Sequence, residues 1–279
     1  MVFHRSYFLS FFISLVLLLV INTAHGQSRR AVRAKAGPQT RAYLGLRVTG
    51  NMGWSVFEDE NYRSFTTSLP KTGYSVGLMF LAENKNKYGF QVELNYSKKG
   101  RSVDGDGNDF TKNRASYTYL DMPILVRFAF NGPGYKWYLS GGPELSYWLG
   151  GKGTYTKFYP NNPDDLQFVD HGYKIAFEPY PEDRTQENPG KMYVGEANRF
   201  QLGFNFAIGF IIQANDVNFI GLEGRYSIGH TYLGEFNGGI LPRTGITENF
   251  ESTNQALSIS LIYYFDILQG IRTTKKRSY

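Results

Sequence analysis

The segment RFQLGFNFAIGFII (residues 199–212) alternates strictly between large apolar side chains and small or polar ones. A period of two predicts a β-strand whose two faces meet different surroundings. A soluble sandwich rarely has a face this uniformly apolar on a Gly-rich reverse side, so the pattern favours a membrane-crossing strand. The apolar face comprises Phe200, Leu202, Phe204, Phe206, Ile208, Phe210 and Ile212, and the other face comprises Gln201, Gly203, Asn205, Ala207 and Gly209.

Similar alternation gives eight expected strands along the chain. They cover residues 41–50, 73–82, 87–97, 117–130, 135–149, 199–212, 218–230 and 255–265. The second, fourth and sixth are followed by tight turns, ENKNK, NGPG and QANDV. The other connections have about 22, 18, 50 and 24 residues, and this short-long rhythm is typical of a barrel with short periplasmic turns and long external loops. We therefore predict an all-β, eight-stranded antiparallel transmembrane β-barrel; a secreted β-sandwich is the alternative.

Composition agrees with a β fold and excludes several functions. The 279 residues include 22 Phe, 21 Tyr and 31 Gly but no Cys, which excludes disulfides, thiolate metal sites and a Cys nucleophile. The net charge of +6 comes from basic residues near the two ends of the chain, whereas charges between them are mixed in sign. We therefore expect no nucleic-acid partner.

The chain organisation follows from its two ends. Residues 1–26 read as a secretory signal peptide, with an apolar run from Tyr7 to Ile21 and Ala24-His25-Gly26 before the expected cleavage at Gln27. An N-terminal anchor helix is the alternative. We expect a basic periplasmic segment over 27–40, the barrel over 41–265 and a basic tail over 266–279. An even number of strands places both tails in the periplasm.

The segment YLDMPILVRF (residues 119–128) places charged residues and a proline in one of these strands. The alternation directs Tyr119, Asp121, Pro123, Leu125 and Arg127 into the lumen, and Leu120, Met122, Ile124, Val126, Phe128 and Phe130 toward lipid. Proline removes a ladder donor, so we expect a β-bulge at Pro123. Aromatic residues at strand ends fit the interfacial girdles of such barrels, although each could instead be ordinary core; they include Tyr88, Tyr96, Trp137, Tyr147 and Trp148.

This part of the chain resembles the PorT-like outer-membrane β-barrel proteins. The resemblance rests on Tyr119-Leu120-Asp121-Met122-Pro123-Ile124-Leu125, on Gly141-Gly142-Pro143, and on Gly221-Leu222-Glu223-Gly224-Arg225-Tyr226-Ser227. It implies an eight-stranded barrel in the outer membrane of a diderm bacterium, and some relatives serve type IX secretion and gliding. The chain departs from the family at its end, where DILQGIRTTKKRSY follows Phe265.

A polar network inside the barrel follows from the expected register. With Phe130 opposite Tyr135 across NGPG, Asp121 faces Glu144 and Pro123 lies beside Pro143. Two facing carboxylates in a narrow lumen need either a cation or a shared proton. We predict Arg225 as this cation, with Arg47 second. The full interior network is predicted as Asp121, Glu144, Glu223, Arg225, Arg47 and Arg127, with a structural and not a catalytic role.

Other chemistry has weaker support in the sequence. His230, with Thr231 and Glu235 nearby, fits an outer-leaflet lipid enzyme, although a polar rim residue explains it as well. The acidic stretch VDGDGNDF lacks the Gly and the final acid of an EF-hand, which leaves a loose cation site or a flexible turn. Passive diffusion through eight strands is disfavoured because side chains fill so small a barrel.

We therefore expect a non-enzymatic outer-membrane barrel without cofactor or metal. Its tyrosine-, proline- and acid-rich stretch over about 150–199 suggests an external loop that contacts proteins or glycans, with type IX secretion components as possible partners; a mobile solvated loop is the alternative. The wall is expected to contact outer-membrane lipid.

Overall fold

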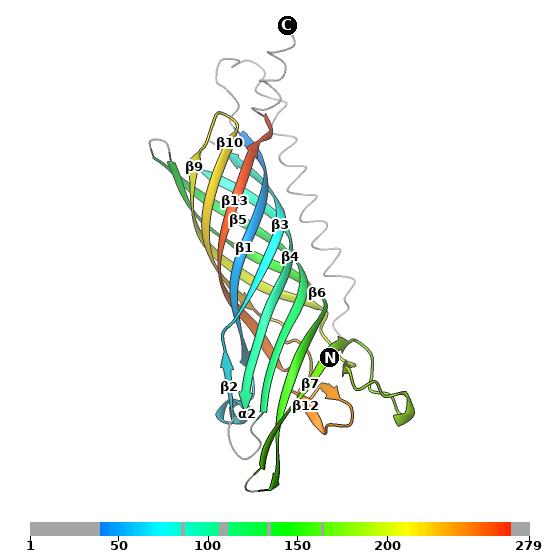
Figure 1. The fold of residues 1–279 in the computed structure, drawn as a ribbon. Helices are drawn as coiled ribbons and strands as arrows, with labels where there is room; N and C mark the ends of the chain where they lie inside the picture. The colour runs from blue at the N-terminus through cyan, green and yellow to red at the C-terminus, as the bar shows by residue number, and fades with distance from the viewer. Residues whose placement is uncertain (1–39, 85–86, 106–110, 133–134, 163–164, 269–279) are drawn as a thin grey trace, which may run out of the picture. The chain divides into compact units, whose positions relative to one another are not determined.

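The computed structural model describes residues 40–84, 87–105, 111–132, 135–162 and 165–268, and these residues are almost entirely β-strand (Figure 1). A short helix, α2 (Glu60–Ser64), begins after Asp59, whose carboxylate accepts the backbone N–H groups of Asn61 and Tyr62. A 3₁₀ turn spans Arg184–Gln186. No helix of the described residues is long and apolar enough to span a membrane.

The strands are β1 (Thr40–Phe57), β2 (Thr66–Leu69), β3 (Lys71–Asn84), β4 (Tyr88–Gly105), β5 (Thr111–Gly132), β6 (Tyr135–Asn162), β7 (Asp165–Ala176), β8 (Lys191–Val194), β9 (Phe200–Gln213), β10 (Asn218–Gly229), β11 (Gly239–Leu241), β12 (Ile246–Glu248) and β13 (Ser252–Asp266).

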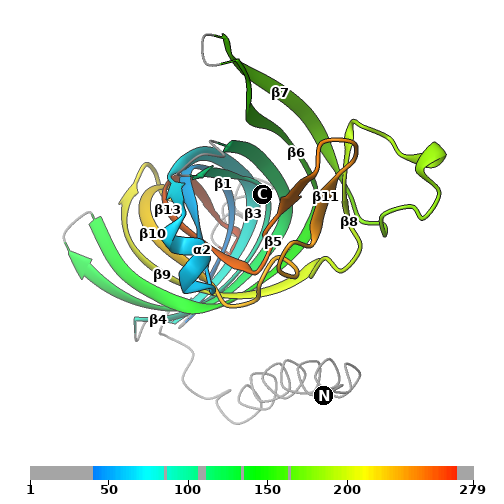
Figure 2. The same cartoon turned by 90° about the horizontal axis from the view of Figure 1, so that it is seen from below.

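The strands form an all-β barrel, as predicted. Antiparallel pairings run in the order β6, β5, β4, β3, β1, β13, β10 and β9, and β9 then pairs with β6 from Tyr135↔Ile212 to Tyr147↔Phe200. Figure 2, a view along the barrel, shows these strands around a common interior. The described residues hold thirteen strands, and the count of eight strands in the barrel itself stays a prediction. The additional strands β2, β7, β8, β11 and β12 lie in the long connections, where no alternating apolar face signalled them.

The faces of the strands match the alternation in the sequence. Within β5, Arg127 is fully buried whereas the neighbouring Phe128 is 46% exposed. The same change of environment at every second residue occurs along β1, β9 and β13. The outward aliphatic and aromatic side chains therefore form the lipid-facing band, and polar side chains fill the lumen.

The register between β5 and β6 corrects the sequence-based expectation. Gly132 pairs with Tyr135, so the strands continue into NGPG and Phe130 lies opposite Trp137. Asp121 consequently faces Ser146, and Glu144 faces Pro123, two residues from the predicted partners. A slip of two preserves which face each side chain occupies, which is why the inward assignment was right and the partners were wrong.

The bulge predicted at Pro123 is also wrong. The register shift in the β5–β6 pair lies between Thr118 and Tyr119. At the proline, β4–β5 pairing stops after Val92↔Ile124 and resumes at Asn95↔Asp121 in unchanged register. A local gap in the ladder therefore accommodates the missing proline N–H.

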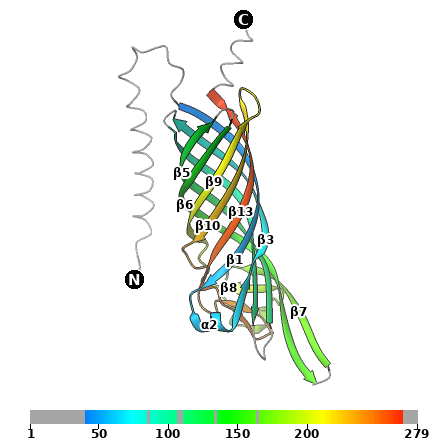
Figure 3. The ribbon, with the colours of Figure 1, turned by 90° about the vertical axis from the view of Figure 1, so that its left-hand side faces the viewer.

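A compact cap covers the barrel end that carries the long connections. Strand β2 pairs with β4, and β6 and β7 form a long hairpin that projects past the barrel (Figure 3). Strands β8, β11 and β12 follow β7 in the sheet. Their apolar side chains pack with Tyr117, Trp148 and Phe250 into one buried cluster, which we call the cap core.

Of the two interpretations left open for Trp148, the structure shows the core and not the interfacial girdle. Its side chain is fully buried in the cap core because it shares the inward face of β6 with Glu144 and Ser146. Tyr88, Tyr96 and Trp137 are exposed on the outer face, and Tyr147 is half-buried there against Phe200. Residues 1–39 and 269–279, which include the expected signal peptide and most of both tails, lie outside the described residues.

The topology predicts a protease pattern on intact cells. Arg184 is exposed in the connection between β7 and β8 at the capped end, whereas β13 ends at Asp266 beside β1 at the other end. Trypsin added to intact cells should cleave the β7–β8 connection and spare an epitope tag placed after Tyr279. Permeabilised cells should lose the tag as well. Loss of the tag from intact cells before the connection is cut would reverse the orientation.

Candidate functional site

The centre of the lumen holds a buried cluster of two carboxylates and three guanidinium groups, from Arg47, Glu93, Arg127, Glu223 and Arg225, which we call the central cluster. Arg47 donates from Nη1 to Glu93 Oε1 at 3.2 Å and from Nη2 to Glu223 Oε1 at 2.8 Å. Arg225 donates from Nη1 to Glu93 Oε2 at 3.0 Å and from Nε to Glu223 Oε1 at 3.0 Å. The cluster thus joins β1, β4 and β10 through charge-assisted hydrogen bonds across the barrel.

Arg127 completes the central cluster from β5. Its guanidinium carbon lies 3.5 Å from the centroid of the Tyr138 ring, and its Nη2 lies 4.0 Å from Glu223 Oε2. It also donates to Gln91 Oε1, while Tyr138 donates its hydroxyl to Glu223 Oε2 at 2.7 Å. Nε and Nη1 of Arg127 have no hydrogen-bond partner within the described residues. The face of the tyrosine ring supplies part of the stabilisation that this buried cation needs.

A second group, which we call the Lys99 cluster, lies closer to the cap. Lys99 Nζ lies 3.0 Å from Asp121 Oδ1 and 3.2 Å from Glu144 Oε1. Ser146 donates its hydroxyl to Asp121 Oδ1 at 2.5 Å, and Asn205 Nδ2 donates to Glu144 Oε2 at 2.7 Å. The two carboxylates therefore share one ammonium group between β4, β5 and β6.

The cation assigned to Asp121 and Glu144 from sequence was wrong. Both side chains point into the lumen as predicted, but their ion pairs within the described residues are formed with Lys99 and not with Arg225 or Arg47. Those two arginines are engaged by Glu93 and Glu223 instead. The six predicted residues thus divide between two clusters: Arg47, Arg127, Glu223 and Arg225 in one, Asp121 and Glu144 in the other.

Sequence reasoning missed Glu93 and Lys99, which complete the two clusters. The alternation in the sequence could have indicated both residues. Glu93 belongs to the polar face of the predicted strand 87–97. Lys99 continues that face two residues past Ser97, where the predicted strand was ended too early; β4 runs on to Gly105. Together the two clusters hold four cations and four carboxylates, so their formal charges cancel within the lumen.

Aromatic layers lie on both sides of these clusters. Toward the cap, Arg101 lies between the Phe57 and Phe250 rings, with its guanidinium carbon 5.0 and 5.4 Å from their centroids. Its Nη2 donates to Glu248 Oε1 at 2.6 Å, which ties the end of β12 to β4. At the opposite end, a buried cluster fills the lumen with Tyr43, Met79, Leu81, Ala129, Tyr138, Ile211, Phe219, Ile262 and Tyr264.

The family-motif residues have a local structural explanation. A Cβ at Gly142 would lie 2.1 Å from the backbone oxygen of Ile124, so only glycine permits this approach of β6 to β5. This is the place where the ladder is interrupted beside Pro123. Pro143 lies opposite Phe204 of β9, and Gly141 lies opposite Val126. Tyr119 is buried and accepts a hydrogen bond from Asn254 Nδ2 at 3.1 Å, while Leu120 faces outward.

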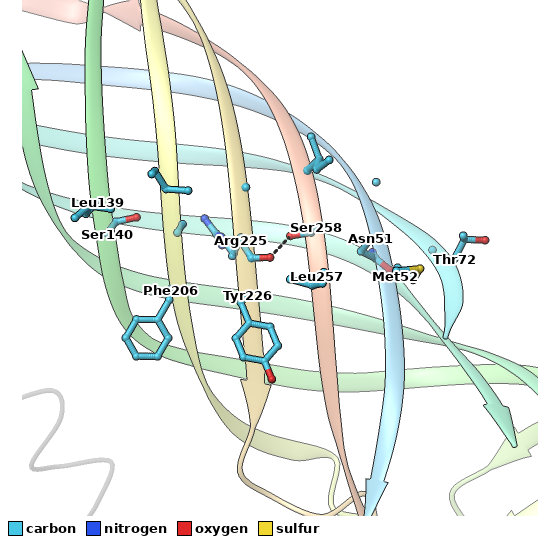
Figure 4. Close-up of a pocket in the computed structure, with 16 residues that line it drawn as sticks. Asn51, Met52, Thr72, Leu139, Ser140, Phe206, Arg225, Tyr226, Leu257 and Ser258 are labelled. Carbon is cyan, nitrogen blue, oxygen red and sulfur yellow. Dashed lines mark hydrogen bonds between the residues drawn. The ribbon is translucent and has the colours of Figure 1, made fainter. Parts of the chain in front are cut away.

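A hollow of about 290 Å³ lies at the uncapped mouth, between Arg41, Tyr43, Glu83 and Lys136. A larger one of about 1020 Å³ is lined mainly by residues of β1, β9, β10 and β13, among them Met52, Phe206, Tyr226 and Leu257 (Figure 4). Its exposed lining is apolar, which fits the lipid-facing band of the wall.

The residues proposed for other chemistry are not brought together. His230 is exposed, and within the described residues its imidazole has no hydrogen bond to a hydroxyl or a carboxylate. Thr231 Oγ1 instead accepts the N–H of Leu202 at 3.0 Å. The side chain of Glu235 lies within hydrogen-bonding distance of Glu196. The hydrogen bond and the negative charge of Glu196 raise the pKa of the Glu235 carboxyl.

No group of side chains suited to a metal ion occurs among the described residues. Asp104, the first acid of the VDGDGNDF stretch, forms an ion pair with Arg114. The remaining acids, at 106–110, lie outside the described residues.

Comparison with known proteins identifies the family. Residues 25–233 match the family described as "Outer membrane protein beta-barrel domain". The chain belongs to this family. It is accordingly a protein of the bacterial outer membrane. No curated protein matches the chain.

Several solved outer-membrane proteins are similar to the chain. OprG from Pseudomonas aeruginosa is 11% identical, with 82% of this chain and 97% of OprG covered and a TM-score of 0.44. Neisserial surface protein A (NspA) is 9% identical, with coverage of 78% and 95% and a TM-score of 0.34. The outer membrane protease OmpT from Escherichia coli is 8% identical, with coverage of 82% and 96% and a TM-score of 0.39.

The central cluster predicts a graded response to substitution at Arg225. Arg225→Ala leaves Glu93 and Glu223 short of a buried cation and should cost about 3–5 kcal/mol of unfolding free energy. Arg225→Lys keeps the charge but not the forked hydrogen bonds, so it should cost less. Thermal unfolding in detergent measures both, with Arg243→Ala, an exposed arginine of the cap, as the matched control. Equal and negligible effects of the two Arg225 substitutions would mean that the lumen is wet and the pairing weak.

Proposed function

We propose that this protein is a closed, non-enzymatic barrel of the PorT-like type that supports secretion or another cell-envelope process by binding partners at its capped, external end. Its transmembrane wall is the cycle of eight strands β1, β3, β4, β5, β6, β9, β10 and β13. The remaining five strands belong to the cap and its projecting hairpin.

The filled lumen is the observation that carries this proposal. Between the two aromatic layers, the central cluster and the Lys99 cluster occupy the interior with buried, mutually bonded charges. An eight-stranded barrel has an interior just wide enough for side chains. Removing these charges from water is costly unless each keeps its partners, which opposes rearrangement into an open pore.

The capped end supplies the surface that remains for function. It holds all five additional strands and the helix α2, so a large part of the chain is folded outside the lipid-facing band. Folded external segments on a rigid barrel are suited to binding, because the scaffold fixes their positions. We propose protein partners, type IX secretion components among them, with glycans as the alternative ligand.

The PorT-like part of the proposal is supported by the motif residues. The motif at Tyr119–Leu125 lies in β5, and Gly141-Gly142-Pro143 lies in β6. The two motifs are in contact where the β5–β6 ladder is interrupted. The two features therefore belong together. The ladder is interrupted beside Pro123 of β5, and at that place only a glycine at 142 allows the β5 backbone to approach so closely. This pairing gives the motif a structural reason to occur as a unit.

Two other functions are weaker candidates. An outer-leaflet lipid enzyme would need His230 to be joined to a hydroxyl and an acid, and Thr231 and Glu235 have other partners. A small-solute channel would need a continuous polar path through the aromatic layers that contain Tyr138, Tyr264 and Trp148.

Conductance measurements test the closed-barrel proposal. Purified protein inserted into planar lipid bilayers should give no discrete current steps, because buried ion pairs and aromatic layers block the lumen. A porin inserted under the same conditions serves as the positive control for insertion and recording. Reproducible steps from the wild-type protein, absent from protein-free bilayers, would make the protein a channel and contradict the proposal.

A further inference from the structure

The β6–β7 hairpin leaves one sheet edge open outside the barrel (Figures 2 and 3). One side of β7 pairs with β6 from Asp165 to Lys174. Its other side pairs with β8 only from Lys174 to Ala176. In the part of the chain that the structure describes, no strand pairs with the remainder of this second side. Open edges are templates for the addition of another strand.

The direction of the backbone groups on this edge follows from one hydrogen bond. Lys174 donates its N–H to the backbone oxygen of Gly190 at 2.9 Å, so Lys174 points away from β6. In an antiparallel pair, alternate residues direct both backbone groups to the same side. The register between β6 and β7 is unbroken from Lys174 to Leu166, so Gly172 and Asp170 also point to the open side. Two N–H and two C=O groups are thus presented there.

The side chains beside these groups define what the edge would accept. Asp170 is exposed, and its Oδ1 accepts the Thr156 hydroxyl at 2.6 Å. A Cβ placed on Gly172 would meet no atom within 4 Å, so the space beside this residue is empty. Phe168, on the same face, is 57% exposed. The edge therefore combines one carboxylate with an open position and an apolar neighbour.

We propose that the edge of β7 at Asp170–Gly172 binds an extended strand of another protein. The incoming strand pairs with the four open backbone groups, carries a basic residue opposite Asp170 and places a bulky side chain opposite Gly172. Opposite charges on directly facing residues stabilise a strand pair, and like charges destabilise it. The inference rests on the proposed function, in which the capped end binds partners, and it names the site and the kind of partner.

A second copy in the same membrane is a poorer occupant of this edge. Two copies in one membrane are related by an axis along the membrane normal, which preserves the component of the β7 direction along that normal. The two edges would meet as parallel strands at equal heights, whereas a parallel ladder needs the facing groups to be staggered. A strand from a different protein has no such restriction.

A defined peptide tests the site on the full-length protein in detergent. The probe is a fluorescent peptide, Ser-Phe-Thr-Lys-Thr-Val-Ser, which in antiparallel pairing puts Phe opposite Gly172 and Lys opposite Asp170. Fluorescence anisotropy should show saturable binding with a Kd below about 1 mM. Replacing the central Lys of the peptide with Glu should weaken binding about tenfold, and Asp170→Lys in the protein should reverse this preference.

A pair of substitutions at Gly172 separates strand addition from other contacts. Gly172→Pro removes an N–H that the fold itself does not use, so the barrel should fold normally and peptide binding should be lost. Gly172→Ala keeps the N–H and should retain binding. No saturable binding to the wild type, or binding that Gly172→Pro leaves unchanged, overturns the inference. Self-association abolished by Gly172→Pro would assign the edge to a second copy and would also overturn it. None of these outcomes alters conductance, so the closed-barrel proposal is judged separately.

Discussion

The structure depends on the bonding of Glu93 and Glu223 to Arg47 and Arg225 inside the barrel. Each of these four groups is buried and contacts both partners of opposite charge. A charge that is removed from water needs partners of opposite charge to offset its lost hydration. Removal of one partner leaves an uncompensated buried charge. Because the four side chains come from β1, β4 and β10, their bonding ties strands that are not neighbours in the sheet.

The same requirement governs the rest of the lumen. Arg127 contributes the third guanidinium to the central cluster, while the Lys99 cluster has one more carboxylate than it has cations. The two local imbalances are opposite in sign, so neutrality is reached only over both clusters together. Arg101 with Glu248 and Lys136 with Glu83 are balanced pairs nearer the two ends. The lipid-facing wall can stay apolar because these charges face carboxylates or cations of opposite sign inside the lumen.

Much of this arrangement could be predicted from the sequence, and the rest depends on distances that alternation does not contain. The period of two placed Arg47, Asp121 and Glu223 in the lumen and gave all the strands of the paired cycle. It could not choose Lys99 over Arg225, because that choice depends on register and strand length. A turn that is tighter by two residues moved the partner of Asp121 from Glu144 to Ser146. The cap strands escaped detection because short pairings such as β8 with β11 show no periodic pattern.

A double-mutant cycle between Glu93 and Arg225 tests the central claim most directly. Unfolding free energies in lipid vesicles are compared for the wild type, Glu93→Gln, Arg225→Gln and the double variant, with Glu83→Gln and Arg225→Gln as a control pair of separated residues. The account predicts a coupling energy of about 1–3 kcal/mol for Glu93 with Arg225 and additivity for the control. Additivity within about 0.5 kcal/mol for both pairs would contradict it.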